Sequence, residues 1–188
     1  EVINYSFMEE NALDMFRLAP DDTRRELVRL KNPLNKDWSC MRTTMLPGLL
    51  LTILSNFNRN MLDLKLFEVG RNYFDTGEGR LPRETECFAA VMTGVREKTI
   101  WSRKGEEVDF FDLKGSLETV LETLRCEDVK FRETDQSFFN SQRSAEVLID
   151  GKAVGSIGEL NEEVLEAFDL HRKVVACELD IEEIARAT

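Results

Sequence analysis

Residues 67–74 read Phe67-Glu68-Val69-Gly70-Arg71-Asn72-Tyr73-Phe74, and they continue an alternation of apolar and charged residues that begins at Leu64. Alternation with a period of two predicts a strand over residues 64–69. A nearly continuous apolar run from Cys87 to Val95 follows. Such a run is typical of a central strand that is covered on both faces. The two stretches together predict a sheet in the core of the protein.

Further patterns surround these strands. Alternation also predicts a strand over residues 1–7 and a hairpin that turns at Asp150-Gly151, and residues 173–179 are predicted to form a last strand. Helical spacing of apolar residues predicts helices over 11–16, 47–59, 112–124, from 161 onward and over 181–187. We expect Asn11, Asp112 and Asn161 to cap three of these helices, and Pro47 to lie in the first turn of another. Turns or loops are predicted at 32–35, 76–79 and 101–108. Because hairpins outnumber βαβ units, the prediction is an α+β fold with an antiparallel sheet flanked by helices.

Length and composition describe an ordinary globular domain. The chain has 188 residues, of which 42% are hydrophobic and 32% charged, and no apolar run is long enough to cross a membrane. It opens with Glu1 rather than Met. We therefore expect residues 1–188 to be a single domain excised from a longer cytoplasmic protein. The four cysteines are dispersed, and His171 is the single histidine. This pattern predicts reduced thiols and no metal site.

The net charge of −11 disfavours a nucleic-acid-binding role for this domain, since an acidic surface repels phosphates. A local positive patch stays open as an alternative.

Six phrases, in order, resemble the β subunit of bacterial phenylalanyl-tRNA synthetase. They are Asn32-Pro33-Leu34, Met41-Arg42-Thr43-Thr44-Met45-Leu46-Pro47-Gly48-Leu49, Leu66-Phe67-Glu68-Val69-Gly70-Arg71, Phe110-Phe111-Asp112-Leu113-Lys114-Gly115, Arg143-Ser144-Ala145-Glu146 and Gly158-Glu159-Leu160. The resemblance implies the class II aminoacyl-tRNA synthetase-like fold. It also marks family-typical structural positions: Arg42, Pro47, Gly70, Arg71, Asp112, Lys114, Gly115, Arg143 and Glu159. The chain departs from the family pattern at Asn140-Ser141-Gln142, where we expect a changed loop.

Against the catalytic α subunit of that family, the resemblance implies a degenerate active site. Phe74 stands where an arginine would hold the α-phosphate of ATP, and Glu183 where an arginine would grip the γ-phosphate. Ala89, Ala90 and Met92 replace polar substrate-binding residues, and Glu178 and Asp180 add negative charge. Lost cations and gained carboxylates oppose a triphosphate. If the pocket persists in degenerate form, Phe74, Ala90, Met92 and Glu183 should converge on one filled or acidic cavity.

The resemblance thus implies a non-catalytic domain with no catalytic residue, metal ligand or cofactor of its own. Its partner would be the α subunit, in an α2β2 heterotetramer that charges tRNA(Phe) with phenylalanine and uses ATP and Mg²⁺. The tRNA would be bound by other modules. Two alternatives stay open: an active ATP-dependent ligase with a remodelled pocket, and a tRNA-binding module.

Individual residues carry competing interpretations. Lys114 and Gly115 could cradle a phosphate at a helix start or form a packing turn, and His171 could be a general base or a surface residue. Glu182 and Glu183 could bind Mg²⁺ or favour a helix dipole. We expect Arg71 to form a structural ion pair. The apolar face of residues 46–57 is predicted to be core, although part of it could meet a partner. Trp38 and Trp101 lie in loop-like stretches, where an exposed ring would indicate an interface; partial burial against the core is the commoner alternative.

Overall fold

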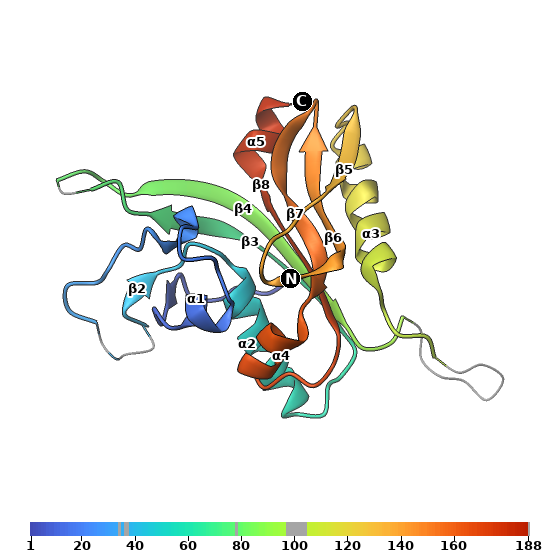
Figure 1. Ribbon diagram of the computed structural model, residues 1–188, viewed down its shortest axis with the longest axis horizontal. Coiled ribbons are helices and arrows are strands. Elements are labelled where there is room, and N and C mark those ends of the chain that lie inside the picture. The colour runs from blue at the N-terminus through green and yellow to red at the C-terminus, as the bar shows by residue number, and fades with distance from the viewer. Residues whose placement is uncertain (34, 36–37, 78, 97–104, 188) are drawn as a thin grey trace.

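The computed structural model describes residues 1–188 except 34, 36–37, 78, 97–104 and 188. A six-stranded sheet in the described residues has the order β3-β4-β8-β7-β6-β5, and every neighbouring pair is antiparallel (Figure 1). Its strands are β3 (Leu64–Phe74), β4 (Arg83–Thr93), β5 (Val129–Glu133), β6 (Phe139–Ile149), β7 (Lys152–Leu160) and β8 (Val174–Asp180). The predicted α+β class with an antiparallel sheet is confirmed.

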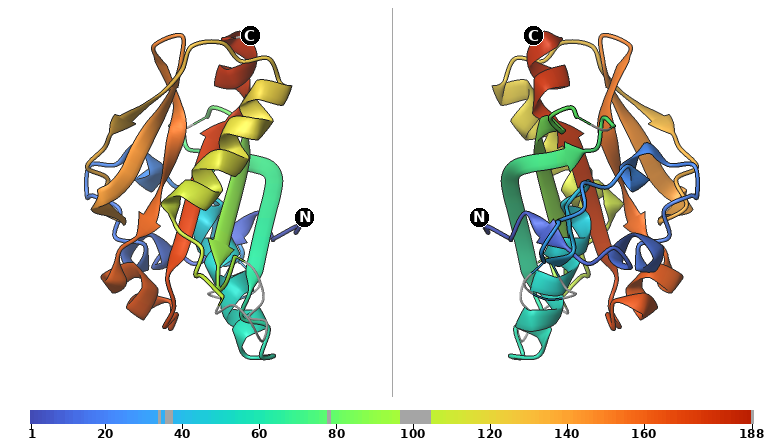
Figure 2. Two further views of the ribbon diagram at one scale, coloured as in Figure 1. Left: turned by 90° about the vertical axis from the view of Figure 1, so that its right-hand side faces the viewer. Right: turned by 90° about the vertical axis from the view of Figure 1, so that its left-hand side faces the viewer.

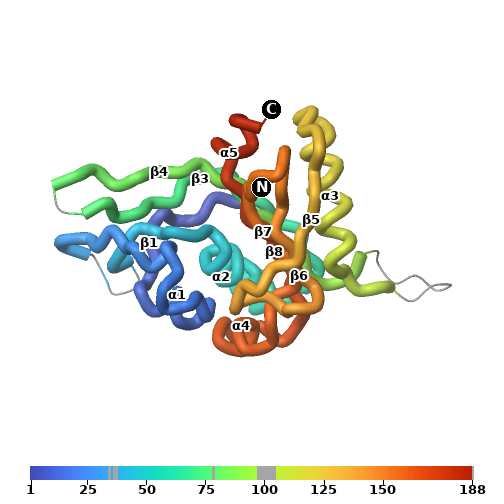
Figure 3. The backbone as a smooth tube through the Cα atoms, turned by 45° about the horizontal axis from the view of Figure 1, so that its top comes forward, coloured from blue at the N-terminus to red at the C-terminus, as the bar shows by residue number. Residues whose placement is uncertain are grey.

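Helices cover both faces of the sheet. One face packs against α1 (Ala12–Met15), α2 (Leu46–Phe57) and α4 (Glu162–Ala167), which lie together in Figure 3. The other face packs against α3 (Phe110–Thr123) and α5 (Ile181–Arg186), which lie on the same side of the strands in Figure 2. Ala89 and Val91 of β4 belong to the first core and Ala90 to the second. The prediction of a central strand covered on both faces is therefore confirmed.

The predicted helix starts are partly right. Pro47 lies in the first turn of α2, and the side chain of Asn161 accepts the N–H of Val164 at 2.8 Å, as an N-cap should. The prediction for Asp112 is wrong by one turn. Asp109 is the N-cap of α3, and Asp112 is its capping-box partner three residues later. Both residues are acidic, so the sequence alone does not separate them.

Of the N-terminal predictions, the helix over residues 11–16 is confirmed as α1, but the strand over residues 1–7 is wrong. Residues 1–6 form no strand, and only β1 (Phe7–Met8) pairs with β2 (Cys40–Met41). The reason is that the N–H and side chain of Asn4 bond to the Glu68 carboxylate instead of to a neighbouring backbone. Asn11 caps nothing, because its own backbone is already helical. A 3-10 turn, η1 (Thr23–Arg25), follows and is capped by Asp22.

The C-terminal half matches the predictions more closely. The hairpin turns at Asp150 and Gly151, with φ of 49° and 75°, and this backbone suits an Asp-Gly pair. Strand β5 was not predicted. The expected loop at residues 140–142 is wrong, because these residues belong to β6, where the pairing with β7 is irregular between Phe139 and Ser144. Trp101, Leu34 of the first predicted turn and Glu78 of the second lie outside the described residues.

None of the helices in the described part of the chain combines the length and hydrophobicity that a membrane crossing requires.

Candidate functional site

Cross-strand register shows which predicted site residues share a face. Ala89 of β4 pairs with Glu68 of β3 and Glu178 of β8, and Cys87 pairs with Asp180. Residues directly opposite each other in an antiparallel pair point to the same side. Alternation along β3 adds Phe74 to that side. The face toward α2 therefore carries Phe74, Ala89, Glu178 and Asp180.

Ala90 and Met92 lie on the other face, where they pair with Cys177 and Val175. They line an apolar groove of about 290 Å³ between α3 and strands β3 and β4. Glu183 is in the first turn of α5, where its N–H donates to Asp180 and its carboxylate pairs with Arg186. The prediction that Phe74, Ala90, Met92 and Glu183 line one cavity is wrong, because consecutive strand residues point to opposite faces.

Glu178 is the centre of a polar cluster on the α2 face. Its carboxylate accepts the Thr44 hydroxyl at 2.5 Å, the Met45 N–H at 2.9 Å and the Asn72 amide at 2.8 Å. Thr44 and Asn72 are buried. Three donors satisfy a carboxylate that would otherwise be costly to bury. The acidic residue thus ties the start of α2 and strand β3 to strand β8.

Arg42 and Glu68 form a second buried cluster beside it. Their side chains are 6% and 2% exposed, and Arg42 Nη1 donates to Glu68 Oε1 at 2.7 Å. Arg42 Nε also donates to the carbonyl of Arg71 at 3.0 Å. The guanidinium lies across Gly70, since a Cβ at that position would come within 2.3 Å of Arg42 Nη2. A glycine at position 70 is therefore needed for the arginine to reach its partners.

Phe74 ends β3, and its ring is covered by a cation. The guanidinium carbon of Arg83 lies 4.2 Å from the ring centre, and Arg83 Nη1 donates to the Thr85 hydroxyl at 3.2 Å. Such a cation–π contact favours a charged group on an aromatic face. Phe74 is therefore packed beneath the arginine side chain of its own hairpin.

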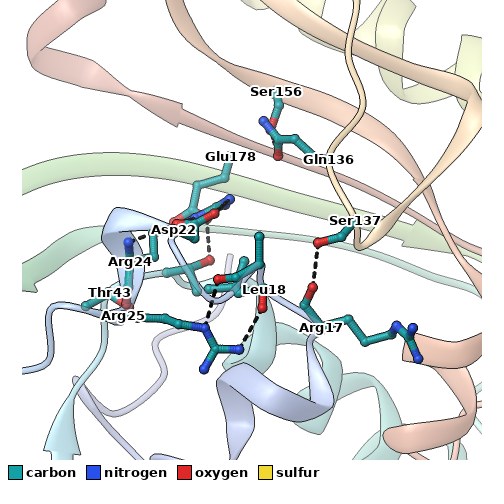
Figure 4. Close-up of polar contacts among 12 residues, drawn as sticks. Arg17, Leu18, Asp22, Arg24, Arg25, Thr43, Gln136, Ser137, Ser156 and Glu178 are labelled. Carbon is teal, nitrogen blue, oxygen red and sulfur yellow. Dashed lines mark hydrogen bonds and ion pairs between the residues drawn. The ribbon is translucent and has the colours of Figure 1, made fainter.

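The segment before α2 supplies more arginines to this region (Figure 4). Arg24 pairs with Asp22 at 2.6 Å, and Thr43 donates its hydroxyl to the Arg24 carbonyl at 2.5 Å. Arg25 donates to the carbonyls of Leu18 and Ala19 at 2.6 and 2.9 Å. The pKa of Asp22 is lowered: burial raises it, but the hydrogen bonds and charge of Arg24 outweigh that effect. These arginines are used to hold the segment in place.

The family-typical positions outside this cluster make structural contacts. Arg71 pairs with Glu84 and Glu86 at 2.9 and 3.1 Å, which confirms the predicted ion pair. Arg143 pairs with Glu159 at 2.9 Å across β6 and β7.

Lys114 pairs with Glu118 and lies over the Phe131 ring. Gly115 is inside α3 with nothing near its missing side chain, so the packing-turn interpretation is wrong.

The remaining candidates for chemistry are engaged or exposed. His171 is on the surface, 3.2 Å from Asp169, and Glu182 and Glu183 both pair with Arg186. Burial raises the pKa of the Cys177 thiol to about 12 and that of Cys87 still further. All four cysteines are free, and no group of three metal-binding side chains occurs in the described part of the chain.

Sequence reasoning missed the residues that organise the site. Asn4, Thr44, Glu68 and Asn72 carry its hydrogen bonds, but none was singled out. Glu68 carried a signal, because an acidic residue interrupts the apolar side of the alternation at a position that faces the core. Asn72 carried none, since an isolated asparagine is also common on surfaces.

The six-stranded antiparallel sheet and the helices on its two faces give this chain the class II aminoacyl-tRNA synthetase fold. Pyrrolysyl-tRNA synthetase from Desulfitobacterium hafniense superposes with a TM-score of 0.71 at 15% identity, over 98% of this chain and 61% of that one. The family follows from the sequence comparisons. Residues 1–181 match the family model for the phenylalanyl tRNA synthetase beta chain CLM domain, and the chain belongs to that family.

Curated relatives agree with the family model. The chain is 37% identical over 186 residues to a phenylalanine–tRNA ligase beta subunit of Syntrophus aciditrophicus, and 40% identical over 186 residues to that of Geobacter metallireducens. In each case the match covers 98% of this chain and 23% of the relative. The chain therefore spans about a quarter of the length of these relatives.

Proposed function

We propose that this domain is a non-catalytic, class II synthetase-like module of a phenylalanine–tRNA ligase β subunit. Its role is architectural: it supports the α subunit that makes phenylalanyl-adenylate with ATP and Mg²⁺ and charges tRNA(Phe). The proposal extends to the α2β2 assembly, in which other modules of the β subunit bind the tRNA. This domain holds neither ATP nor phenylalanine.

One observation carries the proposal: the cations on the α2 face are already used by the protein. Arg42 is paired with buried Glu68, and Arg83 is stacked on Phe74. A triphosphate needs positively charged donors aimed at its oxygens. Here Glu178 and Asp180 would face it instead. Asn72 Oδ1 is a buried atom that no donor reaches among the described residues, but one neutral acceptor cannot hold an anion.

The two rival functions fit less well. An active ligase with a remodelled pocket would need an open cationic cleft on this face. A tRNA-binding module would need a basic surface, but the chain carries a net charge of −11. In the 17–25 segment, Arg17 pairs with Glu163, Arg24 with Asp22 and Arg25 with Asp14. Paired arginines release few counterions on binding a phosphate backbone.

The test is binding of Mg²⁺–ATP to the β subunit purified without its catalytic partner, followed by calorimetry. We expect no saturable heat up to millimolar ATP. Saturable binding in the micromolar range that is lost on Arg83→Ala substitution would overturn the proposal. A mobility-shift titration with tRNA near physiological salt tests the tRNA-binding alternative, and we expect no shift from residues 1–188.

A further inference from the structure

Helix α2 begins without a capping side chain of its own. Its N-cap residue is Met45, whose side chain makes no capping hydrogen bond, and Pro47 in the first turn has no N–H. The start of a helix carries a partial positive charge and unsatisfied N–H groups, so a negative charge placed there is favoured. Strand β8 supplies that charge, because the Glu178 carboxylate accepts the Met45 N–H at 2.9 Å.

Two further donors complete the surroundings of this carboxylate. Thr44 donates its hydroxyl to one oxygen at 2.5 Å, and the side-chain amide of Asn72 on β3 donates to the other at 2.8 Å. Thr44 and Asn72 are 1% and 3% exposed, so their polar groups are fixed inside the domain. All three donors are neutral. Neutral donors that converge at the start of a helix form an anion-binding site, and here the anion is a side chain of the same domain.

Asn72 has a second polar atom, and it has no partner. Its Oδ1 is buried, and no donor among the described residues reaches it. The amide group is not free to turn over, because Oδ1 would then face the Glu178 carboxylate in place of the donating Nδ2. Both atoms are bound to one carbon, so the unpartnered acceptor lies beside the carboxylate. A buried acceptor needs an O–H or N–H donor, and an ionised glutamate has none.

We infer that the three donors form a site for a small carboxylate and that Glu178 is its built-in occupant. The glutamate satisfies the donors but leaves Asn72 Oδ1 without a partner. A free ligand that fits the site better therefore carries a hydroxyl group next to its carboxylate, as glycolate does. Glu178 is half-buried, so cutting back its side chain opens the site to small solutes. The inference does not depend on the proposed function, because it concerns contacts within the domain.

The experiment removes the occupant in the full-length β subunit and offers a free carboxylate in its place. Glu178→Ala is the test variant, and Glu178→Gln is the matched control, because glutamine keeps the volume of the side chain and so keeps the site filled. Hydrogen exchange of the segment that contains Met45, followed by mass spectrometry, reports whether this N–H is bonded. Acetate and glycolate are the probes. Acetamide controls for shape, and chloride controls for ionic strength.

We expect the Met45 amide to exchange at least about tenfold faster in Glu178→Ala than in the wild type, the factor that corresponds to one lost hydrogen bond to a charged group. Saturating acetate should slow the exchange again at least about fivefold. Glycolate should act at a concentration at least about fivefold lower, since its hydroxyl adds a hydrogen bond at Asn72 Oδ1. Glu178→Gln should not respond, and adding Thr44→Val to Glu178→Ala should abolish the response.

The inference is wrong if exchange in Glu178→Ala responds to neither acid, or responds equally to acetamide or chloride. An equal response in Glu178→Gln would also refute it, because a filled site cannot take a second carboxylate. A Glu178→Ala subunit that refolds neither with nor without acetate would count against it as well, since a refilled site should restore folding. Equal half-saturating concentrations of acetate and glycolate would refute the part assigned to Asn72 Oδ1. None of these results bears on the proposed function, which the Mg²⁺–ATP measurement decides separately.

Discussion

Replacing Arg42 by methionine should strongly destabilise the domain. Arg42 connects the N-terminal segment to strand β3: its N–H donates to Ser6, its carbonyl accepts from Tyr73 at 2.8 Å, and its side chain binds Glu68 and the Arg71 carbonyl. Methionine fills much of the volume but leaves Glu68, 2% exposed, without its cation. Removing one partner of a buried ion pair costs about 3–5 kcal/mol, since the other charge stays buried and uncompensated.

The magnitude is large against a typical total stability of about 5–15 kcal/mol. For a chain of this length it corresponds to a fall in the melting temperature of about 6–20 °C. The assay is urea unfolding followed by circular dichroism, with Arg132→Met as control. Arg132 is 65% exposed and pairs with Glu146 on the surface, so its loss should cost less than about 1 kcal/mol.

The double variant Arg42→Met, Glu68→Met sharpens the test, because it removes the orphaned charge together with the cation. We expect it to be less destabilised than the sum of the two single variants, with a coupling energy of about 1–3 kcal/mol. Equal destabilisation by Arg42→Met and Arg132→Met, or strict additivity at positions 42 and 68, would show that the buried pair does not stabilise the fold.

Three further outcomes follow from single contacts. Gly70→Ala should destabilise the domain by about 1–3 kcal/mol, because the new Cβ would overlap the fixed Arg42 guanidinium. Gly115→Ala should stabilise it by about 0.5–1 kcal/mol, because that glycine is an exposed helix residue. Urea midpoints of the two variants that move in the same direction would contradict these predictions. Burial raises the pKa of Cys177 from 9.0 to about 12, so between these pH values the thiol ionises only in the unfolded chain. The contribution of this thiol to stability should therefore be full below pH 9 and should fall as pH rises toward 12. Cys177→Ala should make the melting temperature depend less on pH in this range, and an unchanged pH dependence would exclude the thiol as its source. Phe74→Leu in the assembled ligase should leave kcat and KM for ATP within about twofold, since the ring contacts Arg83 rather than substrate; a tenfold change in KM for ATP at unchanged stability would place Phe74 at a working site.

Local patterns predicted the sheet well and its N-terminal surroundings poorly. The alternation around Leu64, the apolar run from Cys87 and the Asp150-Gly151 turn each specify a structure through neighbouring residues alone, and the structure has all three. Residues 1–6 alternate equally well, yet they form no strand. Their conformation depends on Glu68, which is more than 60 residues away and competes for the Asn4 N–H. A pattern-based prediction contains no term for such a competitor.

The predicted site residues show a second limit of prediction from the linear sequence. A linear motif overlay assigned Ala89, Ala90 and Met92 to one pocket, but a strand turns each successive side chain to the opposite face, so Ala90 and Met92 lie against the α3 side. Because the four positions Phe74, Ala90, Met92 and Glu183 do not converge, the overlay is wrong as a map of one pocket. Phe74 and Glu178 both lie on the α2 face. Arg83 covers the Phe74 ring, and the Glu178 carboxylate accepts the Met45 N–H.

Under the proposed function, this occupancy gives a physical reason for a synthetase fold without a substrate pocket. Buried, satisfied polar contacts of Arg42, Glu68, Thr44 and Glu178 connect the N-terminal segment, the start of α2 and strands β3 and β8. Such contacts are costly to break singly and hold one geometry. In a catalytic relative these positions would have to leave donors free for substrate. Here the same face holds the N-terminal segment against strand β3, through Asn4 and Glu68. Replacing Arg42 should therefore loosen the N-terminal segment, which Glu68 binds through Asn4, as well as destabilise the fold.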